Sequence, residues 1–138
     1  MSKNDLMVTE EKDMFTTAVK MYSSMSLETE EEKKAFFNTV NAPDYALNEK
    51  IGETIKVKDV FCEPVEMENA EGEVQMCPRV VLVDTKGKTY QSVSFGIYNA
   101  LTKLMMVFGQ PTWENGISIK IKQINKEGGK RVLTFEVV

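Results

Sequence analysis

The chain has 138 residues, of which 42% are hydrophobic and 28% charged, and its formal net charge at pH 7 is −4. A globular protein of this size and composition can bury a sizeable core without disulfides or metals. No apolar run approaches the roughly 18 residues that a membrane-spanning helix needs, and the lack of histidine excludes His-dependent catalytic triads and most imidazole-ligated zinc sites.

Residues 1–50 are predicted to form an acidic N-terminal helical extension. The predicted elements are helices over Glu10–Met25 and Glu30–Val40 and a single turn over Tyr45–Lys50. The first rests on apolar residues at spacings of three and four. The second rests on Thr29 and Glu32, which have the spacing of a capping box, with Phe36 and Phe37 as its apolar side.

After Gly52 the spacing of apolar residues changes to two, which is typical of strands. The clearest case is residues 117–124, where isoleucines alternate with Ser118, Lys120 and Lys122. The predicted strands are 55 to about 62 or beyond, 74–84, 89–94, 117–124 and 131–138, and a helix is predicted over Ile97–Phe108.

The order β-β-β-α-β-β predicts a mainly β fold in which residues 51–138 form a five-stranded OB-type barrel. In such barrels the face of the second and third strands and the hairpin loops bind oligonucleotides. A β-sandwich and a split α+β sheet have similar strand counts and remain open at this point. The single helix between the third and fourth strands favours the barrel.

The charge is divided along the sequence. Residues 51–75 contain two Lys and seven Asp or Glu, whereas residues 76–138 contain nine Lys or Arg and four acids. Single-stranded nucleic acid needs cations along the phosphate path and flat side chains for base stacking. The cations predicted to contact phosphate are Lys56, Lys58, Lys86, Lys88, Lys120, Lys122, Lys130 and Arg131, with Lys126 in the same hairpin. Outward lysines on strands also serve solubility and edge protection.

Tyr90, Tyr98 and Trp113 are candidates for stacking on bases, because each lies among polar neighbours or at a loop, and Tyr90 and Trp113 are the two included in the predicted site. Tyr90 is placed on the polar face of the third predicted strand, and Trp113 lies in a predicted loop. Trp113 is equally compatible with a role as a plug at one end of the barrel. Phe36, Phe37 and Phe108 lie on apolar helix stripes and are assigned to packing.

The loop between the first two predicted strands argues against nucleic-acid binding, because five carboxylates would repel phosphate. They are Glu63, Glu66, Glu68, Glu71 and Glu73. Either this loop points away from the strand path or it serves another partner. No enzymatic activity, metal or cofactor is predicted, since no nucleophile has a base beside it and Cys62 and Cys77 read as free thiols. The polar, acidic N-terminus is unlike a signal peptide, so a cytoplasmic location is expected.

The stretch from residue 41 to 138 resembles a family of small single-stranded-DNA-binding proteins of tailed bacteriophages. The segments that carry the resemblance are 41–44, 51–60, 77–82, 88–94 and 108–113. The resemblance implies an OB-type fold that coats single strands during phage genome replication, without catalysis, in the cytoplasm of a bacterial host.

The leading hypothesis is therefore binding of single-stranded DNA with little base preference, and RNA is left open. The alternative is a non-catalytic interaction module that docks a replication or virion protein through its acidic loop and N-terminal helices. Self-association through these helices is a further expectation.

Overall fold

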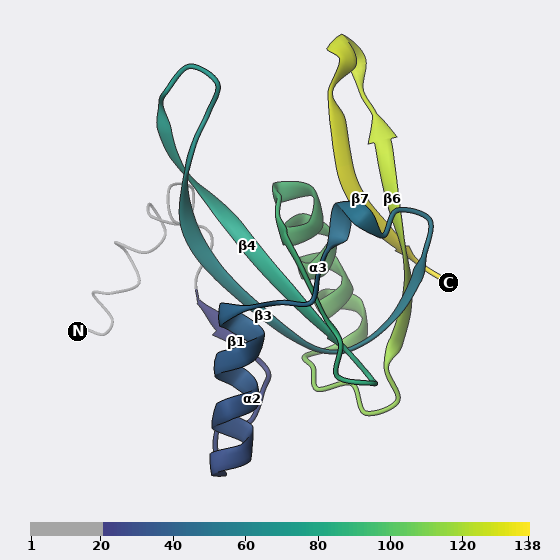
Figure 1. Ribbon diagram of the computed structural model, residues 1–138. Coiled ribbons are helices and arrows are strands. Elements are labelled where there is room, and N and C mark those ends of the chain that lie inside the picture. Colours follow the sequence, from purple (N-terminus) through teal and green to yellow (C-terminus); the bar gives the residue numbers. More distant parts are fainter. Residues whose placement is uncertain (1–20) are drawn as a thin grey trace, which may run out of the picture.

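The computed structural model describes residues 21–138 and shows a mainly β protein (Figure 1). The strands are β1 (Tyr22–Ser23), β2 (Tyr45–Ala46), β3 (Thr54–Glu68), β4 (Val74–Asp84), β5 (Thr89–Val93), β6 (Ile117–Asn125) and β7 (Arg131–Val137). The helices are α2 (Glu30–Asn41) and α3 (Phe95–Phe108), with 3₁₀ turns η1 (Leu47–Glu49) and η2 (Glu127–Gly129). No helix in the described part of the chain is long and apolar enough to cross a membrane.

The strands form one curled sheet that is consistent with an OB-like barrel. Within residues 21–138 the order is β2-β5-β4-β3-β6-β7, and β1 pairs with β3. The predicted strands correspond to β3 to β7, and α3 lies between β5 and β6 as predicted. The predicted strand count was wrong, because the short strands β1 and β2 make the sheet seven-stranded over these residues. No ladder joins β5 to β7 within the same residues, so the sheet is a half-barrel.

β3 organises the sheet, because it pairs with β4 along one edge and with β6 along the other. It runs to Glu68, past Cys62 as the prediction allowed, and continues with β4 as a long hairpin. The pairing shifts register between Val57 and Asp59, so Lys58 lies in a β-bulge. Pro64 stands opposite Pro78 beyond the part of β3 that pairs with β6, where a missing N–H is tolerated.

The core lies on the inner face of the curled sheet, under α3. Fully or nearly fully buried side chains from β3, β4 and β6 meet Leu101 and Leu104 of α3 there. On the outer face α2 covers Phe61 of β3, and Phe36 packs edge-on against that ring at 5.6 Å. The assignment of Phe37 and Phe108 to packing was wrong, since these side chains are 63% and 50% exposed.

The capping box predicted for α2 is confirmed. The Thr29 hydroxyl accepts a hydrogen bond from the Glu32 N–H, and the Glu32 carboxylate accepts one from the Thr29 N–H. Residues 10–20 of the helix predicted over Glu10–Met25 lie outside the described residues. Its C-terminal part was wrong, because Tyr22–Ser23 form β1, paired with Phe61 and Cys62 of β3.

The path from β5 through α3 to β7 fixes the other side of the sheet. Ser94 caps α3 by accepting a hydrogen bond from the Ile97 N–H, and the helix ends at Gly109, whose φ of 85° is in the left-handed region. At Gly96 the helix approaches β7 so closely that a Cβ would overlap the carbonyl oxygen of Leu133. The absence of a side chain therefore sets the distance between α3 and β7.

Candidate nucleic-acid interface

The lysines of β3 and β6 lie on one outward face of the sheet. Thr54 stands opposite Lys120, and Lys56 opposite Ser118, so the pleat directs Lys56, Lys120 and Lys122 to the same side. The isoleucines and valine between them are buried, while the three lysines are exposed. The register makes β3 and β6 neighbours in the sheet, as an OB-type barrel requires of its first and fourth strands.

Lys58 differs from the other three lysines of this set. It is half-buried in the β-bulge, and its carbonyl oxygen accepts a hydrogen bond from the Trp113 N–H at 2.9 Å. A regular strand would place Lys58 on the same face as Lys56. The bulge breaks this alternation of side chains. Lys58 is therefore set apart from the regular outward row.

The loop between β4 and β5 brings Lys86 and Lys88 to the end of β3. The Asp84 carboxylate accepts hydrogen bonds from the backbone N–H groups of both lysines, at 2.9 and 2.8 Å, which shapes the turn. The Thr85 N–H donates to the carbonyl oxygen of Lys56, so the loop is joined to β3 beside the outward row. Both lysine side chains are exposed.

The hairpin between β6 and β7 carries further cations to its tip. Lys126 and Lys130 flank η2 and are joined by a hydrogen bond from the Lys126 N–H to the Lys130 carbonyl oxygen. Arg131 follows at the start of β7, and all three side chains are exposed. Gly128 and Gly129 have φ values of 81° and 78°, which turn the chain within this short tip.

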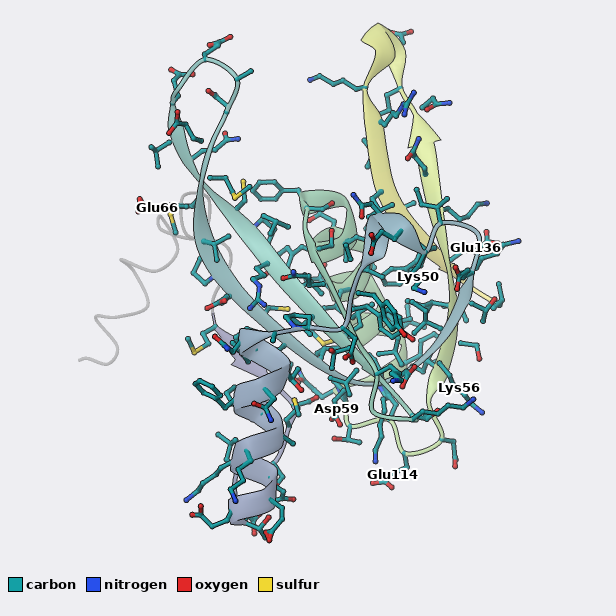
Figure 2. The ribbon with its side chains drawn as sticks, viewed as in Figure 1. Lys50, Lys56, Asp59, Glu66, Glu114 and Glu136 are labelled. Carbon is teal, nitrogen blue, oxygen red and sulfur yellow. The ribbon has the colours of Figure 1, made fainter. Side chains whose placement is uncertain are left out.

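These exposed cations follow β6 from one end of the sheet to the hairpin tip, and we call them the basic line. Its members are Lys56, Lys86, Lys88, Lys120, Lys122, Lys126, Lys130 and Arg131. Two acids interrupt it: Glu136 of β7 pairs with Lys122 at 3.1 Å, both side chains being 48% exposed, and the exposed Glu127 lies between Lys126 and Lys130. Figure 2 shows Lys56 and Glu136 on one side of the molecule, and Glu66 on the other.

Tyr90 lies in the core, so its predicted place on a polar, exposed face was wrong. The side chain is 8% exposed, and its ring stacks on Tyr45 with centroids 5.3 Å apart. Its hydroxyl donates to the Asp84 carboxylate at 2.8 Å. Burial, reinforced by this hydrogen bond, raises the pKa of Tyr90 well above its ordinary value. Its burial, the stacking on Tyr45 and the hydrogen bond of its hydroxyl thus engage this residue within the fold.

Trp113 is also part of the core cluster and is 9% exposed. Its indole N–H donates to the Gly109 carbonyl oxygen at 3.2 Å, and its backbone continues the edge of β3 beyond β6. These contacts match the plug that the sequence left open. Trp113 and Tyr90 are therefore both buried, and neither ring is assigned to base stacking in the proposed function.

The structure brings together one aromatic–cation pair that the sequence pattern did not indicate. Lys50 lies over the Tyr45 ring, with its Nζ 4.0 Å from the centroid. Both residues are half-buried and belong to the segment predicted as a simple turn, where β2 instead pairs in parallel with β5. Neither residue belongs to a periodic run, so no sequence signal joined them.

Arg79 is a second residue that the sequence did not single out. On the outer face its guanidinium donates to Glu63 at 2.9 Å, to Gln91 at 3.0 Å and to the Val40 carbonyl oxygen at 2.6 Å. It links three strands to the end of α2. Its side chain is 12% exposed, so this cation is engaged within the fold.

The acidic loop lies on a different hairpin from the basic line. β6 pairs with β3 only through Thr54–Val57, whereas the acidic residues follow beyond Cys62 on the β3–β4 hairpin. We call residues 65–77 the acidic arm; in Figure 1 it and the β6–β7 hairpin both extend toward the top of the view, the arm at the left and the hairpin at the right. At its tip the Asn69 side chain accepts hydrogen bonds from the N–H groups of Glu71 and Glu73, both at 2.9 Å.

Comparison with protein families places this architecture in a known class. The family model described as phage single-stranded DNA-binding protein, of the Phi29 type, matches residues 15–138. This is most of the chain and includes every strand named above. The chain belongs to the Phi29-type family of phage single-stranded DNA-binding proteins. Searches of curated proteins and of solved structures gave no match.

Proposed function

We propose that this protein coats single-stranded DNA with little base preference during phage genome replication, in the cytoplasm of the bacterial host. The observation that carries the proposal is the basic line on a member of a single-stranded-DNA-binding family. Phosphates would follow β6 from the β4–β5 loop to the β6–β7 tip, while the acidic residues lie on a separate hairpin. Contacts to phosphate alone carry no sequence information, which accounts for a weak base preference.

The proposal is tested by titrating a dye-labelled oligonucleotide and following its anisotropy at several salt concentrations. Trp113 fluorescence is a poor probe, because that ring is buried in the core. Lys120→Gln with Lys122→Gln should weaken binding about 25-fold at 0.1 M salt, since each lost contact with a single strand changes the salt slope by about 0.7. The slope of log affinity against log salt should become shallower by about 1.4.

Lys33→Gln with Lys34→Gln is the matched control, because it removes the same charge from exposed positions of α2. This variant should keep the affinity and the slope of the unmodified chain. Equal losses of affinity in both variants would show that the overall charge of the protein, and not the position of the basic line, determines binding. Binding indifferent to salt, or no binding at low salt, would overturn the proposal. A matched RNA oligonucleotide tests whether the 2′-hydroxyl is tolerated.

A second candidate function is docking of a replication or virion protein through the acidic arm and the N-terminal residues. It is favoured by the exposure of the arm, where Glu66, Glu68, Glu71 and Glu73 stand beside the exposed apolar side chains of Val74 and Met76. Binding of such a partner should persist in the variant with Lys120→Gln and Lys122→Gln. It should be lost when the charge of the acidic arm is reversed. Self-association through the N-terminal residues would appear as a mass that rises with concentration.

A further inference from the structure

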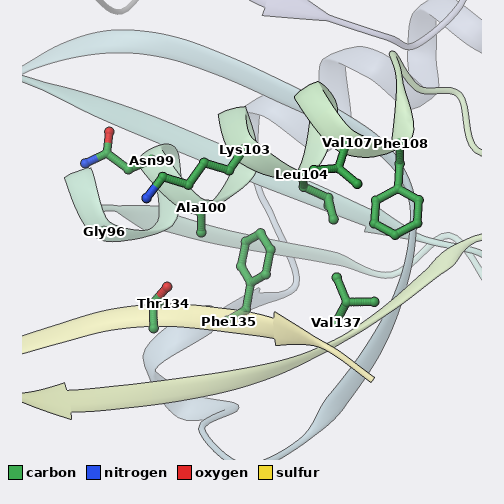
Figure 3. Close-up of a pocket in the computed structure, with 10 residues that line it drawn as sticks. All are labelled: Gly96, Asn99, Ala100, Lys103, Leu104, Val107, Phe108, Thr134, Phe135 and Val137. Atoms are coloured by element: carbon green, nitrogen blue, oxygen red, sulfur yellow. The ribbon is translucent and has the colours of Figure 1, made fainter.

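An apolar cleft between α3 and β7 has no part in the interface described above (Figure 3). Its volume is about 490 Å³, and Leu104, Val107, Phe108, Phe135 and Val137 supply its apolar wall. Val107 is 76% exposed, Phe108 50% and Val137 48%. Large side chains exposed side by side in this way mark a docking surface, because isolated apolar residues rather than clusters are the norm on soluble proteins.

The cleft connects with the start of the described chain through adjoining hollows on α3. Lys103 lines both the cleft and a second hollow that reaches Met106 and Gln110. The second hollow shares Met105 and Gln110 with a third, which Tyr22 lines. These three adjoining hollows, here together called the depression, lie around α3 between β1 and β7.

The chain enters this depression at its far end. The Tyr22 hydroxyl donates a hydrogen bond to the Gln110 side chain at 2.6 Å, directly after the end of α3. From Gln110 back to Lys103 is two turns of helix, or about 10 Å. Seven residues preceding Tyr22 span up to about 25 Å when extended, which is enough to follow the depression into the cleft.

The residues just before Tyr22 have the chemistry that the cleft requires. Met14, Phe15, Ala18 and Val19 are apolar, and Glu10, Glu11 and Asp13 precede them. Lys103, a cation on the rim, is exposed and suits these carboxylates. We propose that residues 10–19 of the same chain cover the α3–β7 cleft, with Met14 and Phe15 against Val107 and Phe108.

The test measures how fast a thiol placed in the cleft reacts. The full-length chain carries Val107→Cys, with the half-buried Cys77 replaced by Ser. Cys62 is left in place, because burial raises its pKa to about 12 and the thiolate is the reactive form. Replacing Met14 and Phe15 by Ser should speed the labelling of Val107→Cys about ten-fold, as expected for a cover that is closed ten times in eleven.

Phe37→Cys in the same background is the matched control, since Phe37 is 63% exposed on α2, away from the cleft. Its labelling rate should not respond to the two Ser substitutions, and circular dichroism checks that they leave the fold intact. A Val107→Cys rate that ignores the Ser substitutions would overturn the proposal. Protection that disappears on dilution would overturn it as well, because the occupant would then be a second copy of the chain.

Discussion

Two hairpins that extend from the sheet carry charges of opposite sign. The acidic arm prolongs β3 and β4, and the β6–β7 hairpin, here called the basic arm over residues 122–134, prolongs the other side (Figure 1). Both are antiparallel ribbons with exposed tips. The first carries carboxylates and the second lysines and an arginine. The formal net charge of −4 therefore conceals a separation of charge in space, because most acids of one ribbon and most cations of the other lie apart.

The two arms are also anchored differently. At the base of the acidic arm Arg79 joins Glu63, Gln91 and the end of α2 by hydrogen bonds. At the base of the basic arm the contact is steric, because Gly96 of α3 lies against the backbone of β7. One anchor therefore depends on charge and the other on the absence of a side chain.

The largest expected effect comes from reversing the charge at each tip. Lys126→Glu, Lys130→Glu and Arg131→Glu together should lower the affinity for single-stranded DNA by at least about 100-fold at 0.1 M salt, since each lost phosphate contact costs roughly five-fold there. Glu68→Lys, Glu71→Lys and Glu73→Lys form the matched variant on the acidic arm. It should raise the affinity by less than about five-fold, a general effect of charge.

Oligonucleotide anisotropy at fixed salt measures both variants, with circular dichroism as the check on folding. If reversal of the acidic arm changed the affinity as much as reversal of the basic arm, the two ribbons would not differ in their access to DNA. The proposed path of the phosphates along β6 would then be wrong.

The steric anchor predicts an unusual response to alanine. In an exposed helix Gly→Ala usually stabilises by up to about 1 kcal/mol. At Gly96 the added Cβ would overlap the Leu133 carbonyl oxygen and lie 2.8 Å from the Val132 Cγ1. Gly96→Ala should therefore lower the free energy of unfolding by about 2–3 kcal/mol in urea titrations. Asn99→Ala, exposed on the same helix, should change it by less than about 0.5 kcal/mol.

The ion pairs beside the two arms should also differ in what they contribute to stability, because they differ in exposure. Arg79 and Glu63 are 12% and 25% exposed, whereas Lys122 and Glu136 are each 48% exposed. Arg79→Ala leaves Glu63 without its partner and should cost about 1–3 kcal/mol of unfolding free energy. Lys122→Ala should cost less than about 1 kcal/mol, as exposed pairs do. Similar values in urea titration would show that Arg79 contributes no more than a surface contact.

The strands were predictable because their side chains alternate locally. In β6 buried isoleucines alternate with exposed lysines, and β4 has the bounds that its turn residues predicted. The capping box of α2 is also local, since Thr29 and Glu32 are three residues apart. Each of these signals lies within one element, so no knowledge of the tertiary fold is needed.

The errors in the candidate site have a tertiary cause. Tyr90 follows an alternating pattern with serines, and only the packing of Tyr45 and α3 makes its face the inner one. Lys58 falls in a bulge that depends on β4, and β2 pairs with β5 from more than forty residues away. Arg79 acts through partners on three other elements. A one-dimensional pattern records none of these contacts.

The smallest effect concerns the two thiols of the β3–β4 hairpin. Burial raises the pKa of Cys62 from 9.0 to about 12, whereas Cys77 is half-buried on the opposite face of the hairpin. The raised pKa means that the folded state holds this proton more tightly than the unfolded chain. The contribution of the Cys62 proton to the free energy of unfolding is complete below pH 9 and is lost as the pH rises toward 12.

Cys62→Val removes this titration, so the free energy of unfolding should decline less steeply above pH 9. The slope should change by up to about 1.4 kcal/mol per pH unit, which corresponds to one proton. Cys77→Val should keep the decline of the unmodified chain. Urea titrations between pH 8 and pH 10 measure both slopes. Because Tyr90 also has a raised pKa, a residual decline should persist in Cys62→Val. Identical slopes in all three proteins would mean that the base of the acidic arm opens to solvent more readily than its packing indicates.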